Sequence, residues 1–235
     1  MPELTIEFTW GLVTPSHVGT GLSQVGYVDR LVRSWDGCPY LPGDAVKGAI
    51  RASAERLYRW LDPNAPKEAA AEPSSVPDNA VLRRIFAPQL ARESNSNSPI
   101  YRFHPARSKD RPRKIPRAGT AIETVTGTAK EQSLRVIETW DNEFVFDLRV
   151  SATYGHWDSR RDSSDLQFLI AAILCTDAVG GKRGTGLGRI SCKSLRVSGL
   201  PPDIKFDIEE IKSLSTVEEL RKHLAPKSPH ENVQA

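Results

Sequence analysis

The glycine-rich run from Gly180 to Arg189 carries the strongest chemical signal in the sequence. It reads GGKRGTGLGR, so five glycines stand among three cations: Lys182, Arg183 and Arg189. Glycine lets a backbone approach a ligand closely, and exposed N–H groups beside cations suit phosphate oxygens. The run matches neither a Walker loop nor a dinucleotide-binding fingerprint. The alternative is a plain turn between a helix and a strand, which needs fewer glycines and no cations. We therefore predict phosphate binding here.

Two further residues whose side chains could take part in a reaction follow the first expected strand, in a second glycine-rich stretch. His17 could act as a general acid–base group, although a lone histidine is more often a structural hydrogen-bonding residue. Asp29 lies in the stretch VGYVDR, and its plain interpretation is a surface carboxylate paired with a nearby arginine. The sequence contains no GxSxG or HExxH motif, and Cys38 has no basic neighbour. Serine-hydrolase, zinc-protease and thiol-nucleophile chemistry are therefore not indicated.

Basic residues are concentrated between Tyr101 and Arg117. This segment carries seven cations against Asp110 alone, which gives it a net charge of +6, whereas the whole chain has +3. A basic cluster is often only a solvated surface. A second cluster inside the glycine run favours a polyanionic partner instead.

The composition is that of an ordinary folded protein. Of the 235 residues, 39% are hydrophobic and 26% are charged, which excludes a wholly disordered or collagen-like chain. The most apolar stretch, Leu166 to Cys175, is about half the length of a membrane span, and the N-terminus shows no secretory signal. The three cysteines are scattered and form no CxxC pair. We therefore expect a cytoplasmic protein with no membrane partner.

The elements that must position these residues alternate between strands and helices. A strand is expected over residues 4–10, because apolar and polar residues alternate there. A helix should begin at Asp44 as its cap and stop before Pro63, with Lys47, Arg51 and Glu55 one turn apart on its polar side. Later elements are a hairpin (120–126 with 134–140), a strand (143–150), a helix capped by Ser163 or Ser164 through Ala178, and a strand (189–197).

This order predicts an α+β fold with a ferredoxin-like, RRM-like βαββαβ core. Residues 1–61 and 118–200 would form this single domain, with a thumb-like β-hairpin over about 118–140. Residues 62–117 would be a large insertion or lid, partly flexible and basic, and residues 201–235 a C-terminal extension. The fold alone does not decide the function.

Several stretches together resemble the RAMP superfamily, the RNA-binding subunits of CRISPR effector complexes. Residues 39–51, PYLPGDAVKGAIR, are similar to that family's PYIPGSSLKGxLR segment, although Asp44 replaces a serine. The 180–189 run resembles its glycine-rich loop. The sequences HVG (17–19) and VGYVD (25–29), and the stretch TVTGTA (124–129), resemble the backbone subunit of type III complexes. The resemblance covers most of residues 4–198.

The resemblance implies a backbone subunit that binds guide RNA and assembles with homologous backbone subunits and other subunits of the complex. Lys47, Arg51, Lys182, Arg183 and Arg189 would contact phosphates, and His17 would help to position the guide. The thumb, with Thr124 and Thr126, would wedge into the duplex of guide and target RNA. Wedging of this kind costs a few kcal/mol of unstacking, which contacts to the kinked strand offset.

The resemblance also implies a catalytic role for Asp29. In the family, the matching aspartate supports cleavage of target RNA that depends on Mg²⁺ or another divalent cation, so Asp29 would be both the catalytic and the metal-binding residue. Three alternatives stay open. They are a non-cleaving capping or adaptor subunit, a metal-independent guide-processing endoribonuclease with His17 as its acid–base group, and an unrelated sheet-based RNA binder. No run resembles the aromatic motifs of ordinary RNA-recognition domains.

Overall fold

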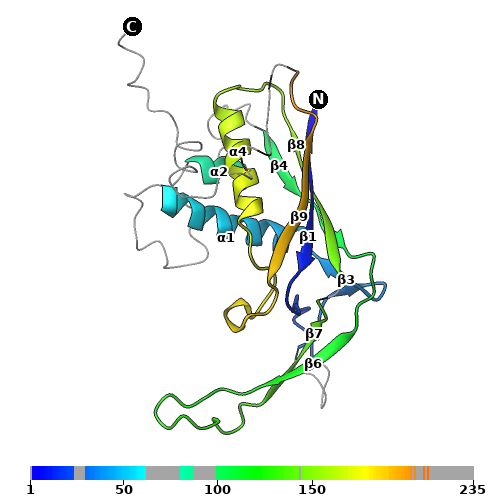
Figure 1. Cartoon of the computed structure of the whole chain (residues 1–235), viewed down its shortest axis with the longest axis vertical. Helices are drawn as coiled ribbons and strands as arrows, with labels where there is room; N and C mark the ends of the chain where they lie inside the picture. The colour runs from blue at the N-terminus through cyan, green and yellow to red at the C-terminus, as the bar shows by residue number, and fades with distance from the viewer. Residues whose placement is uncertain are drawn as a thin grey trace.

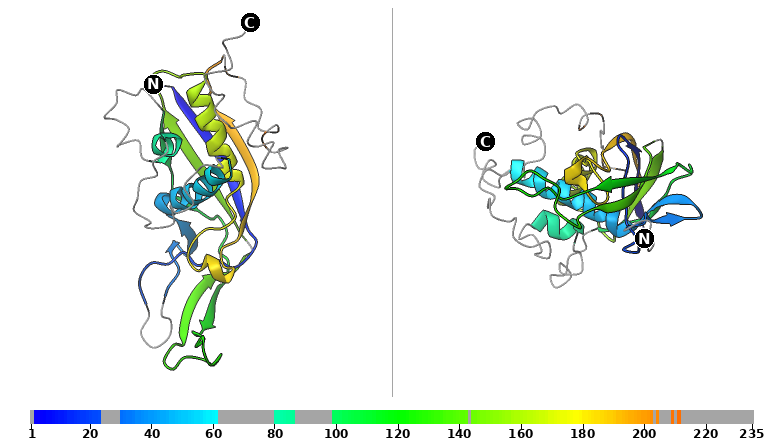
Figure 2. Two further views of the ribbon diagram at one scale, coloured as in Figure 1. Left: turned by 90° about the vertical axis from the view of Figure 1, so that its left-hand side faces the viewer. Right: turned by 90° about the horizontal axis from the view of Figure 1, so that it is seen from below.

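The computed structural model describes residues 2–23, 30–61, 80–86, 99–142 and 144–202, together with residues 204, 209 and 211. Its body is a four-stranded antiparallel sheet in the order β4-β8-β1-β9 (Figure 1). These strands are Ile100–Phe103, Val145–Thr153, Glu3–Leu12 and Ile190–Ser198. The helices α1 (Gly43–Leu61) and α4 (Arg161–Leu174) lie on one face of the sheet (Figures 1 and 2).

The strand order identifies the fold. The chain passes from β1 through α1 to β4, and β8 lies between these two strands. It then passes from β8 through α4 to β9, with β1 between them. Two split βαβ units are thus interleaved, which is the ferredoxin-like arrangement. The predicted α+β fold class is confirmed.

Strand β1 lies at the centre of the sheet, as its alternating sequence requires. Leu4, Ile6, Phe8 and Trp10 are at most 2% exposed and face the helices. Each such side chain contributes about 1.5–3 kcal/mol through burial. The residues between them point to the opposite, open face of the sheet, because side chains alternate along a strand.

Helix α1 begins slightly earlier than predicted. It starts at Gly43, so Asp44 lies exposed in the first turn and not at the cap position. A carboxylate in the first turn still stabilises the helix, because it interacts favourably with the positive N-terminal end of the helix dipole. The helix ends at Leu61, before Pro63, as the sequence indicates.

The predicted boundaries of the second long helix are wrong at both ends. Helix α4 begins at Arg161, because the side chain of Asp158 accepts hydrogen bonds from the backbone N–H groups of Arg160 (3.1 Å) and Arg161 (2.9 Å). Asp158 therefore supplies the capping oxygen that we expected from Ser163 or Ser164. The helix ends at Leu174, four residues before Ala178.

Part of the expected insertion belongs to the core. Helix α2 (Ala80–Phe86) buries Leu82, Ile85 and Phe86, and β4 is an edge strand of the main sheet. A largely buried ion pair, Arg84 to Asp165 at 2.6 Å, connects α2 to α4. Burial raises the pKa of Asp165, and the hydrogen bond from Arg84 opposes that rise. Residues 62–79 and 87–98, and most of the extension from 203 onward, lie outside the described residues.

Two smaller sheets flank the body. One joins β2 (Ser34–Trp35), β3 (Cys38–Leu41) and β5 (Ala106–Arg107). The other is the hairpin of β6 (Lys114–Gly119) and β7 (Arg135–Trp140), which extends as an arm from one end of the molecule (Figures 1 and 2). The expected protruding hairpin is therefore present, but its first long strand is 114–119 and not 120–126. Its basic N-terminal strand comes from the segment assigned to the insertion.

The structure also bears on the cysteines and on membrane crossing. All three cysteines have free thiols. None of the helices in the described ranges combines the length and the apolar character that a bilayer crossing requires.

Candidate nucleic-acid interface

The glycine-rich run forms an exposed loop between α4 and β9, with the 3₁₀ turn η1 (Arg183–Thr185) at its tip. Lys182 and Gly186 flank this turn, and both adopt left-handed backbone conformations, with φ of 60° and 81°. The side chains of Lys182, Arg183 and Arg189 are exposed. The predicted loop therefore presents its three cations to solvent.

The base of this loop is fixed to the segment that leaves β1. The backbone N–H of Gly181 donates to the His17 carbonyl (2.8 Å), and that of Gly188 donates to the Pro15 carbonyl (2.8 Å). Thr14 adds a side-chain bridge, since its hydroxyl donates to the Gly186 carbonyl at 2.8 Å. These bonds hold the tip of the loop in a fixed position relative to the sheet.

His17 is a buried link between the loop and the arm. Its side chain is only 4% exposed, and Nδ1 donates to the carbonyl of Glu138 on β7 at 2.7 Å. Its own carbonyl accepts from Gly181 on the other side. The structure therefore places His17 where it positions two elements, below the surface that carries the cations.

Gly188 is the glycine at which this loop is least tolerant of a side chain. Its φ is +71°, and an added Cβ would overlap the carbonyl oxygen of Val179. We expect Gly188→Ala to lower the free energy of unfolding by about 2 kcal/mol, because an L side chain is disfavoured in the left-handed region and the clash adds strain. Chemical denaturation with a constant slope against denaturant would measure this loss.

Gly184 provides the matched control for that substitution. It lies in the same loop with open space around its Cβ position and no positive φ. Gly184→Ala should change stability by less than about 0.5 kcal/mol. Equal losses for the two variants would contradict the assigned loop geometry.

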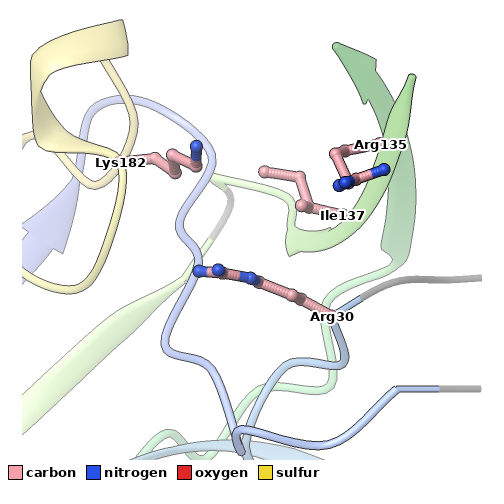
Figure 3. A pocket seen from close by; sticks show the side chains of 4 residues that line it. All are labelled: Arg30, Arg135, Ile137 and Lys182. Carbon is pink, nitrogen blue, oxygen red and sulfur yellow. The ribbon is translucent and has the colours of Figure 1, made fainter. Parts of the chain in front are cut away.

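A cleft of about 580 Å³ lies between the glycine loop and the arm. Its lining residues are Arg30, Arg135, Ile137 and Lys182. Figure 3 shows Lys182 on one side, Arg135 and Ile137 on the other, and Arg30 extending between them. The three charged side chains are exposed, and all are cations. A cleft with this lining attracts an anion and has an apolar contact at Ile137.

The wall of the cleft is built by pairing between distant segments. The backbone of Arg30 forms a β-bridge with that of Ile137 on β7. The Arg30 carbonyl accepts a hydrogen bond from the N–H of Glu138 at 2.9 Å. The Glu138 carboxylate in turn accepts from the N–H of Val32 at 3.0 Å. At the base of the arm, the Lys114 ammonium lies 5.1 Å from the ring centroid of Trp140, within cation–π range. The arm and the segment after residue 29 are thus joined as one wall.

The arm ends in an exposed turn. Glu123 and Thr128 close it by a backbone hydrogen bond of 2.8 Å, and Gly127 supplies the positive φ of 69°. Thr124 and Thr126 lie exposed in this turn. Three apolar side chains near the tip are also exposed to solvent: Ile122 by 60%, Val125 by 92% and Leu134 by 65%.

Lys47 and Arg51 do not line the cleft. Arg51 pairs with Glu55 at 2.7 Å along the helix. Arg56 of α1 binds Asp177, just before the glycine loop, at 2.7 Å and thereby lowers the pKa of that carboxyl. Lys47 precedes Arg56 by nine residues, or about 2.5 helical turns, so it lies on the opposite flank of α1.

The open face of the main sheet has a different character from the cleft. The aromatic side chains of its four strands pack into the core. The open face carries ion pairs instead, including Arg149 with Glu3 and Lys109 with Asp147. The hydrogen bond from Lys109 lowers the pKa of Asp147 and keeps it ionised. A face with carboxylates and no exposed rings lacks the stacking surface of a sheet-based RNA binder.

Asp29, the expected catalytic and metal-binding residue, lies outside the described residues, although its neighbour Arg30 lines the cleft. Within the described ranges, no group of three or more His, Cys, Asp or Glu side chains could hold a metal ion. A magnesium ion held by one carboxylate, substrate phosphates and water needs no such group.

Arg30, Arg135 and Ile137 line the cleft but were not predicted from the sequence. Arg30 was seen only as a partner for Asp29, and Arg135 lies in an expected strand with no basic run around it. The one available signal was the position of Arg30 directly after VGYVD. The cleft depends on three segments that are more than 40 residues apart in sequence and meet only in the fold.

A comparison with models of protein families gives one match. The model of the RAMP superfamily matches residues 12–191, which is most of the chain. This range includes the glycine loop, the arm and all four residues of the cleft. A search of curated proteins found no match. The chain therefore belongs to the RAMP superfamily of CRISPR-associated RNA-binding proteins.

Proposed function

We propose that this protein is a backbone subunit of a type III CRISPR effector complex, which binds guide RNA and cleaves the bound target RNA. The observation that carries the proposal is the cationic cleft between the glycine loop and the arm. Three cations from separate segments surround a space large enough for a sugar-phosphate strand, and phosphate contacts supply most of the affinity for RNA of any sequence.

The glycine loop and the arm would have different roles in RNA binding. Lys182, Arg183 and Arg189 would contact phosphates of the guide, and the buried His17 would keep the loop in register with the arm. The arm tip, with Thr124, Thr126 and the exposed Val125, would insert beside the guide–target duplex. Lys47 and Arg51 would contact a more distant part of the strand, since their flank of α1 faces away from Asp177.

Asp29 is the proposed cleavage residue, and it would hold Mg²⁺ or another divalent cation. When bound, the cation would stabilise negative charge that develops on the phosphate during cleavage. The cleft residues of this chain would hold the strand in place, so that its 2′-hydroxyl stays in line with the bond to be broken. Arg30 would position phosphates at the residue that directly follows Asp29.

The burial of His17 favours this proposal over a metal-independent guide-processing enzyme. A general acid–base group must reach the proton it transfers. At 4% exposure, with Nδ1 bound to the Glu138 carbonyl, His17 presents very little of its surface to a substrate. The non-cleaving capping or adaptor subunit remains the second candidate, because it would use the same cleft without Asp29.

The test is to co-express the protein with a type III complex, purify the particle through a tag on this chain, and sequence the RNA that it contains. We expect repeat-derived guide RNA in the particle, at a constant ratio to this subunit. A particle that incorporates the chain but lacks such RNA would refute the proposal. A tagged subunit from an unrelated RNA-binding complex serves as the control for RNA acquired during lysis.

A further inference from the structure

The hairpin of β2 and β3 presents an exposed tryptophan that does not line the cleft. Strands β2 and β3 are joined by Asp36 and Gly37, both with positive φ (50° and 74°), as a two-residue hairpin turn requires. The hairpin projects on the side of the molecule away from the helices (Figures 1 and 2). Trp35, immediately before the turn, is 57% exposed, although a tryptophan normally buries most of its surface.

The Trp35 ring is held by its neighbours. Its centroid lies 5.5 Å from that of Tyr40 on β3, with the ring planes tilted by 45°. Tyr40 pairs in turn with Arg107 on β5. Cys38 and Pro39, the first two residues of β3, are buried, so this strand of the hairpin packs against the body of the protein. A ring fixed in this way loses little conformational freedom when a ligand stacks on it.

The surroundings of the ring are cationic. Arg107 is half exposed and uses one guanidinium nitrogen to bind Asp36 at 3.1 Å, which orients the group and leaves its other donors available. The chain continues from Arg107 to further exposed cations: Lys109, Arg111 and Arg113. These four cations face three carboxylates: Asp36, which Arg107 binds, Asp147, which pairs with Lys109 at 2.9 Å, and the exposed Asp110.

We propose that Trp35, Tyr40 and Arg107 form a second RNA site, at which an unpaired base of single-stranded RNA stacks on Trp35 while Arg107 contacts the adjoining phosphate. An exposed aromatic ring beside cations is the chemistry with which proteins hold single-stranded nucleic acid without reading its sequence. The site rests on the RNA-binding part of the proposed function and is independent of cleavage. It would give Arg107, one of the cations of the basic segment, a defined contact.

The test compares the affinities of the purified full chain for two fluorescein-labelled probes, measured by fluorescence anisotropy. One probe is a short oligouridylate, and the other has the same length with abasic riboses. Trp35→Ala should weaken binding of oligouridylate roughly tenfold and leave binding of the abasic probe unchanged, because only the first probe has bases to stack. Trp35→Phe should restore most of the affinity.

Trp60→Ala is the matched control, since Trp60 is also exposed (55%) but lies at the end of α1. It should bind both probes like the wild type.

Equal affinities of Trp35→Ala and the wild type for oligouridylate would overturn the inference, as would an equal loss on both probes. A shift of the Trp35→Ala variant to smaller species in sedimentation, with unchanged RNA affinity, would assign the surface to contacts between protein chains. Failure of the wild type to bind either probe would instead refute RNA binding by the chain itself.

Discussion

Asp29→Ala should reduce cleavage of target RNA by a factor of several hundred while the protein still binds guide RNA with unchanged affinity. The reason is electrostatic: a divalent cation at the reacting phosphate contributes several kcal/mol of charge stabilisation, which corresponds to a rate factor of this size. The measurement is single-turnover cleavage of labelled target RNA by the reconstituted complex, with guide RNA quantified in the same particles. Asp29→Asn should behave in the same way, since it keeps the shape of the side chain and removes its charge.

Asp110→Ala is the matched control for this prediction, because Asp110 is an exposed acid in the basic segment. It should leave the cleavage rate within about twofold of the wild type, the range expected for a surface substitution. Chelation with EDTA should stop the wild-type reaction, and added Mg²⁺ should restore it. Cleavage that persists in Asp29→Ala, or that survives EDTA, would remove Asp29 from the reaction and leave the non-cleaving subunit as the better description.

The second large effect should come from removal of the cleft cations. The triple variant Arg30→Ala, Arg135→Ala and Lys182→Ala should bind RNA about a hundredfold more weakly at 0.1 M salt. Each phosphate contact to a single strand releases about 0.7 counterion, which corresponds to about a fivefold change in affinity at that ionic strength. Three lost contacts should also reduce the slope of log affinity against log salt by about 2. Anisotropy titrations across a salt series measure both quantities.

The matched control removes three cations from the main sheet, which does not contribute to the cleft. Arg149, Lys193 and Arg196 are exposed on β8 and β9, and none of them lines the cleft. Their triple substitution with alanine produces the same change in net charge. It should lower affinity by less than about threefold, since distant exposed charges are screened within about one Debye length. Similar losses for the two triple variants would show that only net charge matters, which would contradict a defined RNA path through the cleft.

The sequence was sufficient where the signal was local. The alternation of Leu4, Ile6, Phe8 and Trp10 predicted the central strand, and the apolar spacing before Pro63 predicted α1. The glycines and cations of residues 180–189 identified the loop without any knowledge of its neighbours. Such features depend on propensities and periodicities that act within a few residues, so they can be read from one short stretch.

The predicted ends of helices were less accurate than the predicted helices and strands themselves, because a nearby side chain took the capping role of the expected one. The cap of α4 is Asp158, not Ser163 or Ser164, since its carboxylate already satisfies the first free N–H groups. The edge strand β4 has four residues with no clear alternation, so the sequence pattern gave no reason to place it in the main sheet. Its position depends on pairing with β8, more than 40 residues later.

The residue types thus determined by themselves that this is an α+β protein with a cationic glycine loop and a protruding hairpin. Only the tertiary structure decided which cations share a cleft. It brought Lys182 together with Arg30 and Arg135, placed Lys47 on another flank of α1, and buried His17 between the loop and the arm. The physical reason is that a cleft is made by long-range packing and strand pairing, whose partners no local pattern specifies.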